Sequence, residues 1–154
     1  MINRKAIAIV AALAATATAI PVVAQDIEGA VSARQSQFRI LSMNVGVLGN
    51  MARGNSEYDA EAAAAAANNI RAISELNQRF NWPEGSDNAA IEGTRALPAI
   101  WENVPDLVSK WQNLNTAAVA LDAVAGNGLD EMRAAFGPVG AACGACHDAY
   151  RAPQ

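Results

Sequence analysis

The 154-residue sequence contains very few imidazole and thiol side chains, with one histidine and two cysteines. A structural zinc site needs four ligands of the thiolate or imidazole type, and these residues offer only three. The sequence also lacks clusters of β-branched residues, and it shows no alternation of strand and helix patterns. This argues against a thioredoxin-like pair of redox cysteines, which follows a strand in a βαβ unit.

Positive charge is scarce as well. The formal net charge is −4, and leaving out residues 1–24, which include Arg4 and Lys5, leaves nine basic against fifteen acidic side chains, a net charge of −6. No basic cluster occurs in residues 25–154. Such an acidic surface argues against nucleic acid and anionic membranes as partners.

Only one apolar run of any length occurs, near the N-terminus. It extends from Ala6 to Ile20, follows two basic residues and precedes the small residues Val22-Val23-Ala24. The run is too short to favour a membrane span. It predicts a signal peptide over residues 1–24, and the alternative is an uncleaved anchor. The rest of the chain, residues 25–154, has a length that fits one domain with one core.

Both cysteines and the only histidine fall in one stretch, Cys143-Gly144-Ala145-Cys146-His147. C-x-x-C-H is the attachment signature of a c-type haem. Two thiols one helical turn apart can each bond to a haem vinyl group, and the next imidazole can then ligate the iron. We therefore predict one covalent haem c, attached at Cys143 and Cys146, with His147 as axial ligand. The alternative is two structural thiols beside an incidental histidine.

This kind of attachment takes place outside the bacterial cytoplasm. It agrees with the predicted signal peptide, so the expected location is the periplasm.

Alanine is abundant, and apolar residues recur at the spacing of three and four that is typical of helices. We expect an all-α protein that forms an antiparallel four-helix bundle. The expected helices run from about Asp26 to Met51, from near Tyr58 to Phe80, from about Ala99 to Ala125 and from near Leu129 to Tyr150. Asn81 to Pro98 is expected to be the longest loop. Pro138 is expected to kink or loosen the last helix upstream of the motif.

Four segments together resemble one known family. They are Ala134–Arg151, which reads Ala-Ala-Phe-Gly-x-Val-Gly-x-x-Cys-x-x-Cys-His-Asp-x-Tyr-Arg, and Ala30–Ser36, Pro83–Ser86 and Thr94–Trp101. In these segments the chain resembles the cytochromes c′, the class II c-type cytochromes. The resemblance implies haem attached near the C-terminus of a four-helix bundle, nitric oxide binding and protection, and a homodimer through the first two helices. Pro138 departs from the family pattern, in which a polar residue is expected.

The resemblance also implies roles for residues around the haem. Arg34 is expected near a haem propionate, with a surface ion pair as the alternative. Its neighbour Gln35 is also expected to bind the cofactor. Arg151 lies four residues after His147 and is expected on the proximal side of the haem. The alternative for Arg151 is a solvated arginine at a helix C-terminus.

The sixth iron ligand would have to be a methionine, because no second histidine exists. Met132 lies on the helix of His147 and cannot reach the opposite haem face. In low-spin members of the family a methionine stands four residues after the arginine of the first helix. Here that residue is Phe38, and Met43 is about 140° away around the helix. The resemblance therefore implies a five-coordinate iron with Phe38 over its open face, and the alternative is that Phe38 is ordinary core.

Phe80 and Trp82 are further candidates for residues that line the haem edge. They lie at the start of the expected long loop.

These features predict a periplasmic haem protein with five-coordinate, high-spin iron that binds nitric oxide and carbon monoxide, with electron transfer as a further role. The alternative is a conventional six-coordinate, low-spin electron carrier, which the absence of a distal methionine argues against. An enzyme such as a peroxidase is not expected, since it needs a distal acid–base residue, usually histidine. The expected partners are the diatomic ligands, a redox partner in the periplasm and a second copy of the chain.

Overall fold

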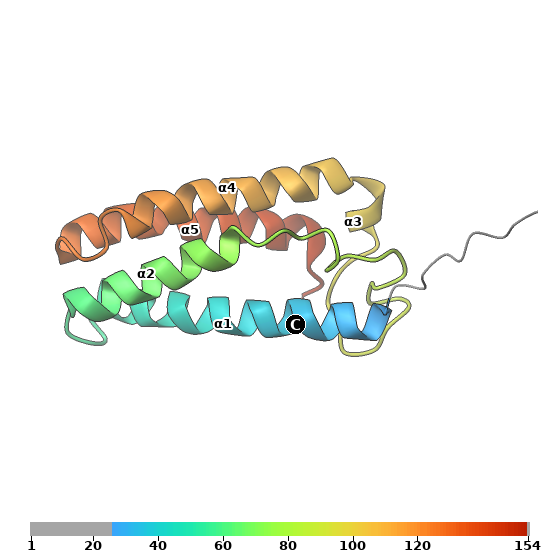
Figure 1. Ribbon diagram of the computed structural model, residues 1–154, viewed down its shortest axis with the longest axis horizontal. Coiled ribbons are helices and arrows are strands. Elements are labelled where there is room, and N and C mark those ends of the chain that lie inside the picture. The colour runs from blue at the N-terminus through green and yellow to red at the C-terminus, as the bar shows by residue number, and fades with distance from the viewer. Residues whose placement is uncertain (1–25, 154) are drawn as a thin grey trace, which may run out of the picture.

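The computed structural model of the protein describes residues 26–153, and in this range it contains five helices. They are α1 (Ile27–Arg53), α2 (Ala60–Ser74), α3 (Ala99–Glu102), α4 (Val104–Asp122) and α5 (Leu129–Tyr150). The four long helices lie side by side, and successive long helices run in opposite directions (Figure 1). The predicted all-α, antiparallel four-helix bundle is confirmed. The predicted signal peptide lies outside the described residues.

Capping side chains explain where three of the long helices begin. Asp26 accepts a hydrogen bond from the backbone N–H of Gly29 at 2.8 Å, and Asp59 accepts one from Ala62 at 3.0 Å. Asn103 caps α4 in the same way, through the N–H of Asp106. These side chains satisfy N–H groups that have no partner within their own helix.

The second helix is shorter than predicted. It ends at Ser74, so the prediction that it extends to Phe80 is wrong, and Leu76 and Phe80 are 51% and 71% exposed. The side chain of Asn77 accepts a hydrogen bond from the N–H of Arg79 at 2.9 Å, which forms a local turn in place of another helical turn.

The third predicted helix is divided at Asn103 into the short α3 and the long α4. Pro105 follows directly in the first turn of α4 and has no N–H to donate to the preceding turn. Proline is favoured in the first turn of a helix and costly in its interior, so its position here is consistent with a new helix that begins after Asn103.

The fourth predicted helix agrees closely with α5, which continues through Pro138 without a break. The expected kink does not divide the helix. Gly137 and Pro138 are exposed, whereas Met132 and Val139 on the inner face are fully buried. The helix therefore stays continuous at Pro138 while Met132 and Val139, on either side of it, pack in the core.

The main core contains side chains from all four long helices. Its largest fully buried members include Leu48, Ile70, Leu121 and Met132. A second, smaller cluster of buried residues contains Ile100, Leu107 and Tyr150 and lies at the end of the bundle where α3 is found. The C-x-x-C-H motif lies where these two clusters meet, because Cys143 packs against the first and Cys146 against the second.

Within the described range, none of the helices combines the length and the apolar character that a membrane crossing requires.

Candidate functional site

The motif occupies the last turns of α5. Cys143 and Cys146 are half-buried free thiols, and His147 is the most exposed of the three residues. Burial raises the pKa of both thiols, so they are protonated at neutral pH. Partial burial, followed by the charges of Arg151 and Arg95, lowers the pKa of His147. A neutral imidazole keeps the lone pair that a metal ligand needs.

Three aromatic side chains from different elements meet one another, and they pack against the same two apolar clusters as the cysteines of the motif. Phe38 of α1 lies 6.2 Å, centroid to centroid, from Trp82 of the long loop and 6.2 Å from Trp111 of α4. Trp111 makes an edge contact with an interplanar angle of 74°, and Trp82 is tilted at 58°. None of these rings offers a metal the lone pair of an ordinary axial ligand. Trp111 is not among the site residues that the sequence predicts.

Two buried donors near this aromatic group have no hydrogen-bond partner among the described residues. They are the indole Nε1 of Trp111 and the amide Nε2 of Gln37. An unpaired buried donor costs about 1–3 kcal/mol, so the site suits a bound group that brings acceptors with it.

Arg34 is almost fully buried, at 2% exposure. Its guanidinium donates to Ser86 Oγ at 2.6 Å and to Thr94 Oγ1 at 3.0 Å, and it also bonds the carbonyl oxygens of Asn81 and Ser86. Its Cζ lies 4.6 Å from the ring centroid of Trp82. Burial lowers the pKa of Arg34, and the charge of Asp87 partly opposes that shift. The alternative of a surface ion pair is therefore wrong, since Arg34 holds the loop against α1.

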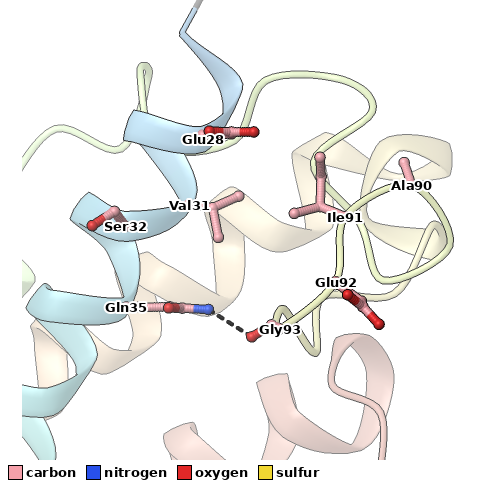
Figure 2. A pocket seen from close by; sticks show the side chains of 8 residues that line it. All are labelled: Glu28, Val31, Ser32, Gln35, Ala90, Ile91, Glu92 and Gly93. Carbon is pink, nitrogen blue, oxygen red and sulfur yellow. Dashed lines mark hydrogen bonds between the residues drawn. The ribbon is translucent and has the colours of Figure 1, made fainter.

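Gln35, the next residue, points out of α1 toward the same loop. Its Nε2 donates to the carbonyl oxygen of Gly93 at 2.8 Å. This bond closes one end of a surface pocket of about 470 Å³, whose rim includes the carboxylates of Glu28 and Glu92 (Figure 2). Gln35 thus lies at the junction of α1 with the loop, next to Arg34.

Phe80, the other residue predicted at the haem edge, is exposed in the structure. It is 71% exposed, and the guanidinium Cζ of Arg79 lies 5.9 Å from its ring centroid. Of the two residues proposed for the haem edge, only Trp82 contacts Phe38.

Beyond the motif, the C-terminal residues pair with the loop that precedes α3. Ala96 and Arg151 form an isolated antiparallel bridge, and Arg95 Nε donates to the carbonyl oxygen of Ala152 at 2.8 Å. The guanidinium NH1 of Arg151 lies 3.1 Å from Nε2 of His147. Arg151 is therefore next to His147, as the resemblance implies, and Arg95 joins it on the same side. No helical periodicity in the sequence indicates this second arginine.

A chain of polar side chains also lies near Cys146. The hydroxyl of Tyr150 donates to Asp106 Oδ2 at 2.5 Å, and the same oxygen lies 3.4 Å from Nζ of Lys110. The hydrogen bond to Tyr150 and the charge of Lys110 hold the pKa of Asp106 below its usual value. In return, Asp106 raises the pKa of Tyr150 to about 12. This cluster joins α4 to the last turn of α5.

No group of three or more histidine, cysteine, aspartate or glutamate side chains in residues 26–153 is arranged to hold a metal ion directly.

Comparison with known proteins identifies the family. A family profile described as cytochrome c′ matches residues 29–151, which is nearly the whole bundle. The chain belongs to the cytochrome c′ family. Among its relatives, cytochrome c-554 of Cereibacter sphaeroides is 37% identical over 143 residues, which cover 91% of this chain and 94% of the relative.

Solved structures agree with this assignment. The structure of cytochrome c′ from Rhodobacter sphaeroides has a TM-score of 0.81 and 33% identity, and the match covers 84% of this chain and 99% of that one. Two variants of cytochrome c′ from Alcaligenes xylosoxidans, one with carbon monoxide bound and one in complex with nitric oxide, have TM-scores of 0.71 at 34% identity. They cover 82% and 83% of this chain and 97% of their own chains.

Cytochromes c′ carry one covalent c-type haem, and the cofactor of this protein is accordingly one haem c. The described residues fit such a group. Two protonated thiols lie on one helix face, a neutral imidazole follows them, and buried N–H donors nearby lack acceptors.

The Asp106 carboxylate should contribute a stability that depends on pH. Its folded-state pKa lies below the unfolded value of 3.8, so the stabilisation is present above that value and is lost as the pH falls through the lowered folded-state pKa. Asp106→Asn keeps a hydrogen-bond acceptor but cannot titrate. We expect the difference in unfolding free energy between wild type and this variant, measured by urea denaturation, to shrink between roughly pH 5 and pH 2.5. A difference that stays constant over this range would contradict the expectation.

Proposed function

We propose that this cytochrome c′ is a periplasmic protein whose five-coordinate, high-spin haem iron binds nitric oxide and carbon monoxide. The observation that carries this proposal is the aromatic group around Phe38. A phenylalanine stands where a low-spin relative would present a methionine, and the side chains in contact with it are Trp82 and Trp111. Met43 is 64% exposed, while Met51 and Met132 belong to the buried main core.

The haem in this proposal is bonded to Cys143 and Cys146 and ligated by His147. Arg34 and Gln35 lie at the junction between α1 and the loop, where the resemblance puts a propionate. The hydrogen bonds of Arg34 use its two terminal nitrogens, which leaves its Nε and its charge for that carboxylate. No ion pair within residues 26–153 involves Arg34, so its charge suits an anionic group of the cofactor.

The side chains around Phe38 favour small neutral ligands. Anions and water lose solvation on entering an apolar pocket, whereas diatomic gases lose little. The nitric oxide and carbon monoxide complexes of the related Alcaligenes proteins support the same ligands for this chain. The aromatic group contains no side chain that acts as a general acid or base, and we therefore propose ligand binding with electron transfer rather than catalysis.

Absorption spectra test the proposal against a six-coordinate, low-spin electron carrier. We expect high-spin spectra for the ferric and ferrous protein, a shift on addition of carbon monoxide, and haem that stays with the chain after denaturation because two thioether bonds hold it. Sharp, split low-spin bands in the ferrous protein would contradict five-coordination. Their loss in Met43→Leu would then identify the sixth ligand, and haem lost on denaturation would contradict the attachment at Cys143 and Cys146.

Shrinking Phe38 should open the distal face. We expect Phe38→Ala to raise the carbon monoxide association rate at least about tenfold, equivalent to ~1.4 kcal/mol off the barrier. The cavity should also lower the unfolding free energy by about 3–5 kcal/mol. Phe136→Ala is the matched control, because it removes the same ring from the main core, seven residues before Cys143 on α5. Stopped-flow rates that are equal in wild type and Phe38→Ala would show that Phe38 is ordinary core.

We further propose that two copies associate through α1 and α2. Ile40 and Met43 of α1 are 51% and 64% exposed, and Val47, one turn after Met43, is half-buried against the main core. Exposed apolar side chains at this spacing suit a helical partner face.

A charge on this stripe should weaken the homodimer. We expect Ile40→Glu to lower the average mass measured by sedimentation at a fixed protein concentration, because association would bury the carboxylate. Val119→Glu, at an exposed position of α4, is the control and should leave the mass unchanged. A monomeric wild type, or equal effects of the two variants, would contradict the assignment of α1.

A further inference from the structure

The turn of α5 that carries His147 is fixed at its end by Tyr150. This side chain is buried among Ile100 and Leu107, and its hydroxyl donates to Asp106 of α4. At 2.5 Å the bond is at the short end of the range for a hydroxyl and a carboxylate, as expected when the acceptor is charged. Lys110, one turn further along α4, contacts the same carboxylate oxygen at 3.4 Å.

The backbone leaves the helix directly after Tyr150. Arg151 is extended, with φ −120° and ψ 123°. The carbonyl oxygen of Tyr150 accepts a hydrogen bond from the N–H of Leu97 at 3.0 Å. The N–H of Ala152 donates to the backbone carbonyl oxygen of Arg95 at 2.9 Å. The end of α5 therefore has backbone bonds to the loop and one side-chain bond to α4.

These contacts bear on His147 because it is three residues before Tyr150, on the same helical turn. When haem and nitric oxide are both bound, the bond between the iron and His147 would be weakened. If the turn is held, the imidazole rebinds from a fixed position, which gives it a high effective concentration. If the turn loosens, the imidazole moves away from the iron more readily.

We propose that the Tyr150–Asp106 hydrogen bond positions His147 and slows its release from the iron when nitric oxide binds. The proposal rests on the proposed function, since it concerns the proximal side of the same haem. Tyr150 and Asp106 are positioning residues that act through the last turn of α5.

Three substitutions test the bond in the haem-loaded protein. Tyr150→Phe removes only the hydroxyl, Asp106→Leu removes the acceptor, and Asp106→Asn keeps an acceptor. The measurement is the rate at which ferrous protein mixed with nitric oxide converts from the six-coordinate to the five-coordinate nitrosyl spectrum. We expect Tyr150→Phe and Asp106→Leu to convert at least about fivefold faster, equivalent to ~1 kcal/mol, and Asp106→Asn, which keeps a weaker neutral acceptor, to fall between wild type and Asp106→Leu.

The control is Asp122→Asn, also on α4. It removes the negative charge from the 2.7 Å pair between Asp122 and Arg71 of α2 near the other end of the helix. It should not change the conversion rate. A second readout is amide hydrogen exchange of residues 148–152 in the haem-loaded protein, which should be faster in Tyr150→Phe than in wild type.

Equal conversion rates in wild type and Tyr150→Phe would overturn the proposal, as would an equal acceleration by Asp122→Asn. If wild type stays six-coordinate with nitric oxide, conversion in Tyr150→Phe supports the proposal and its absence overturns it. The spectrum recorded before the addition of nitric oxide is a separate test of the five-coordinate resting state. A failure of the proposed function can therefore be distinguished from a failure of this proposal.

Discussion

The buried guanidinium of Arg34 is the contact on which the geometry of the site depends most directly. Burying a charge is costly unless hydrogen bonds compensate it, and the loop supplies these bonds from Asn81, Ser86 and Thr94. The same loop brings Trp82 against Phe38 and Arg95 against the C-terminal residues. One charged side chain of α1 therefore organises the loop that borders both sides of the site.

The side of the site at Phe38 and the side at His147 are built by different kinds of interaction. Around Phe38 the contacts are aromatic and apolar, so access to that side is a matter of packing and ring movement. Around His147 the contacts are charged and hydrogen-bonded, through Arg151 and through the turn fixed by Tyr150. In our proposal, packing around Phe38 governs how fast a ligand enters, whereas the hydrogen bond that fixes the last turn of α5 governs how long the imidazole stays in place. A haem bound between these two sides would therefore be subject to two independent controls.

The sequence predicted those features of the site that depend on the spacing of residues within one helix. The C-x-x-C-H motif, the helix that carries it and the position of Phe38 on α1 follow from helical periodicity and from the resemblance. Phe80 was misplaced because a turn at Asn77 ends α2 early, and side-chain capping competes with periodicity there. The Tyr150–Asp106 bond joins residues 44 positions apart, and it exists only because α4 and α5 align in one register. Periodicity within one helix contains no information about that register.

The register matters because α5 is a weak helix by composition. It contains Pro138, which costs about 3 kcal/mol in a helix interior, and three glycines, each costing about 1 kcal/mol relative to alanine. Its stability must therefore come from contacts with other elements. Met132 and Val139 supply buried area before the motif, and Tyr150 supplies a buried ring and a charged hydrogen bond after it. Thioether bonds at Cys143 and Cys146 would add a rigid group between these two anchors, so haem attachment and the ordering of α5 stabilise each other.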